Sequence, residues 1–198
     1  AAATASVKSN GALILSIAAG LDIATLSAML GNERIIRIMP NTPAQVGLGV
    51  AGLFAPQGLQ AADKQIAEQI MQAVGQVYWL EDESRIHAIT GISGSGPAYV
   101  FYLMEALAQA AQAQGFDEKT ARELSLATFK GAVTLAEQSG LPFCQLQKNV
   151  TSKGGTTFAA ISSFGASNIA AEIEAGVQAC VARSNEMQSQ LAQVKQDG

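Results

Sequence analysis

Charged residues are scarce in this sequence. Asp, Glu, Lys and Arg make up 14% of its 198 residues, well below the ~25% of ordinary soluble chains. Apolar residues make up 48%, so we expect much of the surface to be covered, most simply by another copy of the chain. The net charge of −4 argues against nucleic acid or an anionic membrane as a partner.

Histidine and cysteine are scarcer still. The single His87 excludes a multi-histidine site, and no metal is expected. Cys144 and Cys180 lie far apart without metal or redox spacing, which predicts reduced, buried side chains. No Ser-His-Asp or Cys-His arrangement can be argued, so His87 is expected to be structural or on the surface.

Long apolar runs are also missing. No stretch has the roughly 18 consecutive apolar residues that a membrane-spanning helix needs. Residues 1–7 lack the charged-then-apolar build of a signal peptide. These features predict a soluble, cytoplasmic protein without a membrane span.

The first part of the chain has an α/β pattern. An apolar run over 12–18 predicts a strand. A helix is expected over 23–30, with Asp22 as its N-cap and Gly31 at its end. A second apolar run follows over 34–39. Strand, helix and strand at this spacing predict a βαβ unit. Because the unit opens abruptly, it resembles the end of an α/β domain whose beginning is absent.

More α/β elements follow before the pattern changes. The sequence predicts a strand over 49–55, a helix over 61–74 and a strand over 77–80. A charged break at 81–83 places the expected domain boundary after residue 82. The predicted fold class is therefore α/β, with the end of an α/β domain (1–82) followed by an all-α domain (83–198).

The second part has helical spacing throughout. A glycine-rich hinge over 91–97 leads into a helix, and a second helix from Asp117 to about Gln138 is apolar on more than one face, which predicts burial. Further helices are expected over 158–163 and 168–187, with a polar tail from Ser189 that frays. Many alanines permit close crossings with the helices of a second subunit.

One motif is misleading. Residues 47–52 match the dinucleotide-binding pattern G-x-G-x-x-G letter for letter. That fingerprint needs a preceding strand and a helix that opens from it, whereas here a proline-bounded loop precedes it and a strand is expected to follow. A phosphate-binding turn is therefore not expected in the given chain.

The most informative stretch is 149–161, which has two adjacent glycines, hydroxyl residues on both sides and then an apolar run. Gly154 and Gly155 allow backbone conformations and close approaches that a Cβ would prevent. The hydroxyl residues stand where a helix begins, and the N–H groups of such a start can bind a carboxylate or a phosphate. A plain capped helix start is the alternative.

Three motifs in series carry a family resemblance. They are Arg-Ile-Met-Pro-Asn-Thr-Pro over 37–43, Thr-Gly-Ile-Ser-Gly-Ser-Gly-Pro-Ala-Tyr over 90–99 and Asn-Val-Thr-Ser-Lys-Gly-Gly-Thr-Thr over 149–157. In this order and spacing, from about Lys8 to about Met187, the chain resembles pyrroline-5-carboxylate reductase, the last enzyme of proline synthesis. The chain departs from the family in lacking its N-terminal Rossmann half, and Lys153 replaces a frequent proline.

The resemblance implies reduction of 1-pyrroline-5-carboxylate to L-proline by hydride transfer from NADP(H) or NAD(H), with NADP(H) favoured. It implies a substrate carboxylate at the helix start, with Thr157 as the catalytic residue that hydrogen-bonds the ring nitrogen. The implied substrate-binding residues are Ser152, Gly154, Gly155, Thr156, Thr157, Glu137 and, as a weaker match, Glu83.

The resemblance also implies the domains, a cofactor site and an assembly. It implies that 1–82 is the C-terminal part of a Rossmann-type domain and that 83–198 is a helical dimerisation and substrate-binding domain. Asn149 corresponds to a residue that reaches the cofactor, and residues after two strands are expected to form walls for the nicotinamide: Ala18, Ala19, Met39, Pro40, Asn41 and Thr42. Turns at the carboxyl ends of strands are where open α/β sheets bind ligands. The implied assembly is a homodimer, which the family gathers into larger rings.

Two other functions remain open. A related hydroxyacid or phosphogluconate-type dehydrogenase would use a lysine in the helical part, where only Lys153 stands near the glycine stretch. A non-catalytic dimerisation fragment would account for the lack of a nucleotide-binding turn. In that case the chain as given is inactive alone.

Overall fold

The computed structural model describes residues 11–193. The prediction that residues 1–7 do not form a signal peptide therefore lies outside the described residues. Contacts within the chain group the described residues into two compact units. The first comprises the residues up to Pro97 and those from Gly176 onward, and the second comprises Ala98–Ala175. The boundary that the sequence predicts after residue 82 remains a prediction.

The first unit contains a four-stranded mixed sheet. Its strands, in spatial order, are β1 (Ile14–Ser16), β2 (Ile35–Met39), β3 (Gly49–Phe54) and β4 (Gly75–Trp79). β1 and β2 are parallel, β2 and β3 are antiparallel, and β3 and β4 are parallel. The parallel β1–β2 pair with its crossover helix confirms the predicted βαβ unit.

The crossover helix α2 (Ile23–Leu30) begins and ends where the sequence predicts. The Asp22 carboxylate accepts a hydrogen bond from the backbone N–H of Thr25 at 2.7 Å. Gly31 adopts φ 60°, and its N–H bonds back to the carbonyl of Ser27. A left-handed residue at this position normally requires glycine.

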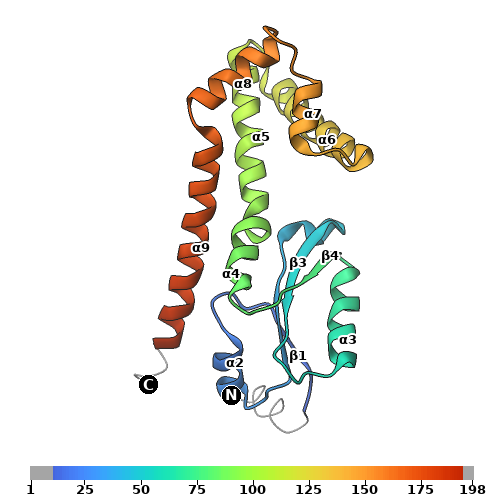
Figure 1. Ribbon diagram of the computed structural model, residues 1–198, viewed down its shortest axis with the longest axis vertical. Coiled ribbons are helices and arrows are strands. Elements are labelled where there is room, and N and C mark those ends of the chain that lie inside the picture. The colour runs from blue at the N-terminus through green and yellow to red at the C-terminus, as the bar shows by residue number, and fades with distance from the viewer. Residues whose placement is uncertain (1–10, 194–198) are drawn as a thin grey trace. The chain divides into compact units, whose positions relative to one another are not determined.

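Helices cover the sheet and complete a small apolar core. Figure 1 shows α3 (Ala61–Gln72) along one side of the sheet and α2 with α4 (Arg85–Ile89) on the other. The core cluster joins β2, β3 and α3: Ile36, Ile38, Ala51, Leu53 and Ala67. The nearly continuous apolar pattern of β2 follows from its burial between strands and layers.

The segment after β2 differs from the proline-bounded loop that the sequence predicts. It forms a short 3₁₀ helix, η1 (Thr42–Val46), which Gly47 ends with φ 74°. Pro43 near its start fits, because the first turn of a helix needs no N–H from proline. Residues 49–54 then form β3, which confirms that the G-x-G-x-x-G pattern opens no helix.

The glycine-rich segment over 91–97 is helical, so the expected hinge is wrong. A π-helical turn, η2 (Thr90–Gly94), joins α4 to α5 (Gly96–Ala113). A Cβ on Gly91 would lie 2.7 Å from Cγ2 of Val181. Gly91 therefore serves close packing against another helix, and the pattern of glycines does not report flexibility here.

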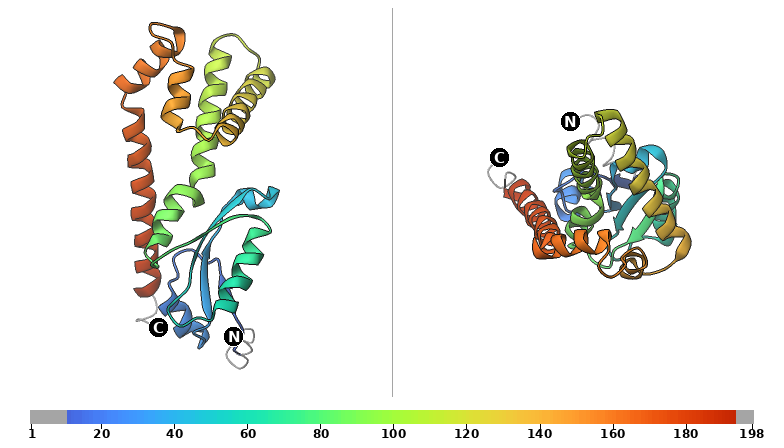
Figure 2. Two further views of the ribbon diagram at one scale, coloured as in Figure 1. Left: turned by 45° about the vertical axis from the view of Figure 1, so that its right-hand side comes forward. Right: turned by 90° about the horizontal axis from the view of Figure 1, so that it is seen from above.

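The second unit is entirely helical in the described residues. Figures 1 and 2 show that short connections join α5, α6 (Glu118–Ser139), α7 (Phe143–Asn149), α8 (Thr156–Ala166) and the start of α9 (Ile169–Gln193), whose residues from Gly176 onward belong to the first unit. Asp117 caps α6 as predicted, with Thr120 N–H donating to its carboxylate at 2.9 Å. The sequence did not predict α7. The tail from Ser189 continues α9 to Gln193 instead of fraying there.

Much of the second unit is apolar and uncovered within this chain. α6 is not buried as its sequence predicts, since Leu124, Leu126 and Val133 are exposed. Cys144 is also exposed, so its predicted burial is wrong, while Cys180 is half-buried and both cysteines are free. Exposed apolar side chains in such number indicate that another protein surface covers them.

Within 11–193, no helix is long and apolar enough to cross a membrane. The same residues contain no group of three or more His, Cys, Asp or Glu side chains arranged to hold a metal ion.

Candidate functional site

The predicted site residues fall into both compact units. The glycine stretch, Glu137 and Asn149 belong to the helical unit. The residues that follow β1 and β2, together with Glu83, belong to the unit that contains the sheet. The geometry within each unit limits what its residues can do.

The glycine stretch forms a tight turn and then a helix start. The N–H of Gly155 donates to the carbonyl of Ser152 at 3.0 Å and closes the turn, and Gly154 adopts φ 71°. α8 begins at Thr156 with Gly155 as its N-cap, and no side chain bonds to this cap. The prediction of a helix start here is confirmed, but the cap is a glycine and not a hydroxyl residue.

The two glycines are needed for different reasons. Gly154 takes a left-handed conformation that side chains with a Cβ rarely adopt. At Gly155 the limit is space, because a Cβ would collide with the Ser152 hydroxyl oxygen and lie 3.2 Å from the Ser152 carbonyl oxygen. The Ser152 hydroxyl therefore lies directly beside Gly155, the N-cap of α8.

The first turn of α8 can bind an anion. Backbone N–H groups at a helix start have no carbonyl partner within the helix, and these groups point out of the turn together with the positive end of the helix dipole. Thr156 is exposed and Thr157 is half-buried. The arrangement offers backbone donors for a carboxylate and a partly shielded hydroxyl next to them.

The other two predicted residues of the helical unit lie on neighbouring helices. Glu137 is exposed near the C-terminal end of α6. Asn149 is the last residue of α7, and its side-chain oxygen accepts a hydrogen bond from Gln145 Nε2 at 2.8 Å. The side-chain oxygen of Asn149 is thus already engaged within its own helix.

In the first unit, the predicted cofactor residues share one edge of the sheet. Because β1 and β2 are parallel and Ser16 pairs with Arg37, the carboxyl ends of the two strands lie side by side. Ala18 and Ala19 follow β1, and 39–42 follow β2. The structure therefore brings these two predicted segments together at the edge where open α/β sheets bind ligands.

The side chains at this edge are small or engaged within the fold. Ala18 and Ala19 offer no bulk beyond a methyl group, and Ala19 and Thr42 are exposed. Asn41 has a structural function, because its Nδ2 donates to the carbonyl of Ser93 at 3.0 Å and its Oδ1 accepts from Val50 N–H at 2.8 Å. These bonds fix the backbone after β2, so Asn41 offers a ligand its main chain more readily than its amide.

Glu83 is part of a buried ion pair. Its Oε1 accepts from Arg37 Nη1 at 2.9 Å and from the backbone N–H of Ile23 at 2.7 Å. Only 2% of the Arg37 side chain is exposed. The Glu83 carboxylate is therefore committed to a buried cation and to the first turn of α2, and its expected contact with substrate is still only a prediction.

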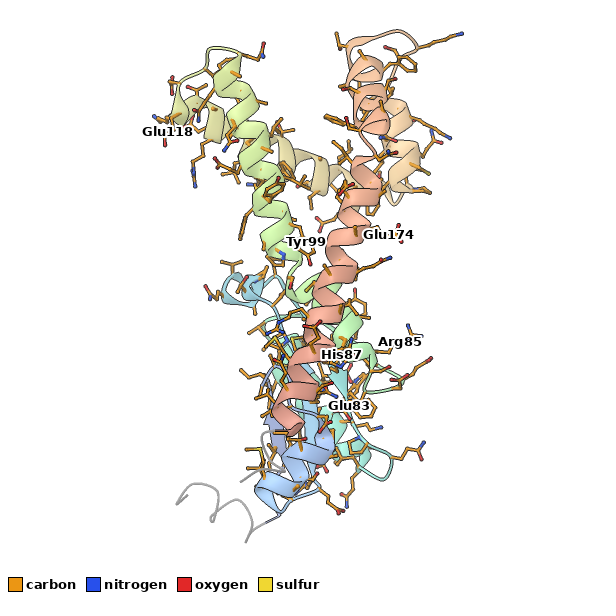
Figure 3. All side chains as sticks on the ribbon, turned by 90° about the vertical axis from the view of Figure 1, so that its left-hand side faces the viewer. Glu83, Arg85, His87, Tyr99, Glu118 and Glu174 are labelled. Atoms are coloured by element: carbon orange, nitrogen blue, oxygen red, sulfur yellow. The ribbon has the colours of Figure 1, made fainter. Side chains whose placement is uncertain are left out.

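His87 is a structural residue, as expected. Its Nδ1 lies 2.8 Å from the hydroxyl oxygen of Ser184 on α9, and the side chain is buried. Figure 3 shows Glu83 and His87 near each other beside the C-terminal part of α9. Burial, followed by the positive charge of Arg37, lowers the pKa of His87 below its usual value near 6.5, so the ring is neutral at pH 7.

Sequence reasoning missed Arg37 and Gln188, which complete this polar cluster. Gln188 Oε1 accepts from Arg37 Nη1 at 3.1 Å, and its Nε2 lies 3.4 Å from the Asp22 carboxylate. An arginine within an otherwise apolar strand, Ile-Ile-Arg-Ile-Met, was the available signal. A buried arginine requires acceptors from elsewhere in the fold.

Comparison with known proteins connects this geometry to a family. A family model described as pyrroline-5-carboxylate reductase dimerisation matches residues 83–187. Curated pyrroline-5-carboxylate reductases from Haemophilus influenzae and Pseudomonas aeruginosa are 44% and 45% identical to the chain. The matches cover 89% and 91% of this chain, and 66% and 67% of those relatives. The chain thus spans about two thirds of their length.

Solved structures agree with the sequence matches. A pyrroline-5-carboxylate reductase from Coxiella burnetii superposes with a TM-score of 0.85 at 38% identity, covering 93% of this chain and 68% of that one. The Plasmodium falciparum pyrroline carboxylate reductase, solved with NADP bound, gives a TM-score of 0.82 at 32% identity. That match covers 89% of this chain and 71% of the other.

Proposed function

The chain belongs to the pyrroline-5-carboxylate reductase family, and we propose that it reduces 1-pyrroline-5-carboxylate to L-proline with NADPH. The observation that carries this proposal is the Ser152–Gly155 turn and the start of α8 at Thr156, which lie within the matched residues 83–187. The turn offers backbone donors for the substrate carboxylate. NADP is favoured because the Plasmodium falciparum relative was solved with it.

The substrate site is proposed at the start of α8. The N–H groups of the first turn hold the carboxylate, with Ser152 and Thr156 beside them, and both glycines permit its close approach. The half-buried Thr157 donates its hydroxyl toward the ring nitrogen of the imine. This nitrogen takes a proton from water, relayed through the Thr157 hydroxyl, while the imine carbon accepts the hydride and the C=N bond becomes a C–N bond. Glu137 and Glu83 are proposed as further lining residues.

The cofactor site is proposed at the edge of the sheet that follows β1 and β2. The residues present fit a planar nicotinamide. Ala18 and Ala19 form a wall of small side chains, and the Asn41 hydrogen bonds fix the backbone of the neighbouring segment after β2. When bound, the cofactor supplies the hydride that the imine carbon accepts. The protein positions the imine carbon and limits its orientations, which are the main contributions a protein makes to hydride transfer. Asn149 is proposed to reach the cofactor from α7.

A homodimer is the proposed assembly, with a larger ring of dimers as a further expectation. The matched family model is one of dimerisation, and the helical unit exposes many large apolar side chains: Phe101, Tyr102, Leu107, Leu124, Leu126, Val133, Leu135, Phe143, Phe158 and Phe164. A groove of about 350 Å³ between α5 and α6 is lined by two of them, Phe101 and Leu126. The division into domains at residues 82 and 83, and the location in the cytoplasm, are likewise proposals.

The decisive test is an activity assay on the protein encoded by the complete gene. We expect oxidation of NADPH, followed by its absorbance, with formation of proline that chromatography detects. A parallel assay with hydroxyacids and NADP⁺ or NAD⁺ tests the related dehydrogenase. Turnover of a hydroxyacid without proline formation from the imine would overturn the proposed function.

A further inference from the structure

The loop over 17–22 joins β1 to α2 and carries two of the proposed cofactor contacts, Ala18 and Ala19. The loop backbone packs directly against α9. A Cβ on Gly20 would lie 2.8 Å from Leu191 Cδ1 and 3.6 Å from the carbonyl carbon of Met187. Gly20 also adopts φ 77°. Because Gly20 has no side chain, it can adopt this left-handed conformation and also lie close to α9.

A polar contact reinforces the packing. Gln188, half-buried on α9, accepts from Arg37 Nη1 at 3.1 Å and donates from Nε2 toward Asp22 Oδ2 at 3.4 Å. Asp22 is the last residue of the loop and the N-cap of α2. One side chain from near the end of the described chain thus connects the loop to the strand beside it.

The two groups that Gln188 contacts, Arg37 and Asp22, are held in place by further interactions. Arg37 is buried within β2 and also binds Glu83, whose carboxylate holds the N–H of Ile23. The pKa of Asp22 is lowered: burial opposes its ionisation, but hydrogen bonds from Thr25 and the charge of Arg37 outweigh burial. Asp22 is therefore a charged acceptor, and a hydrogen bond to a charged group is stronger than one between neutral groups.

We propose that Gln188 is a positioning residue for cofactor binding, because it holds the 17–22 loop in the conformation that presents Ala18 and Ala19. The inference rests on the proposed function. Gln188 does not take part in the chemistry. Its loss leaves Arg37 paired with Glu83, so the fold persists while the loop samples more conformations. Part of the binding free energy of the cofactor is then spent on ordering the loop.

The test compares two methionine variants of the complete gene product. Gln188→Met keeps the length of the side chain and removes both hydrogen bonds, whereas Gln190→Met makes the same change at an exposed position of the same helix. We expect Gln188→Met to raise the Kd and the KM for NADPH by about threefold to tenfold, the range that follows from losing ordinary hydrogen bonds. The kcat at saturating NADPH and the KM for the imine stay unchanged.

A second readout needs neither cofactor nor activity. Hydrogen exchange of backbone amides over 17–25 is expected to become faster in Gln188→Met and to remain at the wild-type rate in Gln190→Met. Equal exchange and equal Kd for NADPH in the two variants would overturn the proposal. So would a fall in kcat and melting temperature with no change in the Kd, because that pattern marks a purely structural residue. A wild-type protein without reductase activity refutes the proposed function, and the exchange rates then still decide whether Gln188 holds the loop.

Discussion

Thr157 is the residue on which the proposed chemistry depends most. Replacing it by alanine removes the hydroxyl proposed to hydrogen-bond the ring nitrogen, whose charge changes during the reduction, and a hydrogen bond to a charged group contributes about 1.5–3 kcal/mol. We therefore expect Thr157→Ala to lower kcat/KM by about tenfold to a hundredfold, with an unchanged melting temperature. Steady-state kinetics measures this. Thr134→Ala on exposed α6 is the matched control, and an unchanged kcat/KM in Thr157→Ala would remove Thr157 from the mechanism.

His87 gives the fold a pH dependence of known sign. Its folded-state pKa is lowered, by burial first and by Arg37 second, so the unfolded chain binds a proton at a higher pH than the folded chain does. The free energy of unfolding is therefore expected to fall as the pH drops below about 6.5, the usual pKa of histidine. Below the folded-state pKa of His87, this loss is complete.

Chemical denaturation between pH 8 and pH 5, a range chosen around the usual histidine pKa of about 6.5, measures the effect. Because His87 is the only histidine in the sequence, His87→Gln should flatten the profile in this range. The carboxylates whose pKa values are lowered, such as Asp22 and Asp117, lose their contribution at lower pH, near and below about 3.9. A wild-type profile that is flat down to pH 5 would contradict the burial of His87.

At the scale of the element, the start of α8 can be tested through its glycines. An alanine at Gly155 would force the Ser152 hydroxyl to rotate away and would press on the Ser152 carbonyl. We expect Gly155→Ala to raise the KM for the imine by about tenfold, since small displacements of a positioning group cost large factors in rate. Gly165 lies in the same helix, and a Cβ there meets nothing within 4 Å.

Gly165→Ala is therefore the matched control. It should leave the kinetics unchanged and stabilise the helix by up to about 1 kcal/mol through its better helix propensity. If both variants bind substrate as the wild type does, the turn at Ser152–Gly155 is not the carboxylate site. Thermal melting of both variants separates an effect on the site from an effect on the fold.

The element scale also shows where pattern reasoning succeeds. Asp22, Gly31 and Asp117 determine local hydrogen bonds, and α2 and α6 begin or end at these residues as predicted. Gly91 and Gly94 could not be interpreted in the same way. Gly91 in η2 packs closely against Val181, a residue 90 positions away, and sequence spacing carries no information about such a contact.

At the scale of the whole molecule, the apolar helical unit predicts an obligate assembly. Leu126 is exposed on α6 and lines the groove between α5 and α6. A buried carboxylate at this position costs several kcal/mol unless it is paired. Leu126→Glu is therefore expected to shift the protein from dimer to monomer at micromolar concentration, as analytical ultracentrifugation would show.

Gln138→Glu adds the same charge to the same helix at an exposed polar position and should leave the dimer intact. If Leu126→Glu sediments as the wild type does, the α5–α6 groove is not part of the interface. A larger ring would be visible in the same experiment as a species heavier than the dimer.

Cofactor binding by the given chain alone is the second prediction at this scale. Among residues 11–193, the single G-x-G-x-x-G pattern leads into β3 and not into a helix, so this pattern offers no helix start that could bind a pyrophosphate. Calorimetry of the 198-residue chain with NADPH is expected to show weak binding or none. A sub-micromolar Kd would show that the sheet edge after β1 and β2 suffices.

The sequence alone determined the local structure and the family. Caps, glycines and apolar periods act over a few residues, which is why they predict α2, β2 and the start of α8, and the three motifs in series identified the family that the comparisons then showed. Tertiary structure decided what depends on distant partners. It paired buried Arg37 with Glu83 and Gln188, used both ends of the Asn41 amide within the fold, and left α6 exposed for another surface. Burial and pairing are properties of the folded chain, since residues far apart in sequence supply both the partners and the cover.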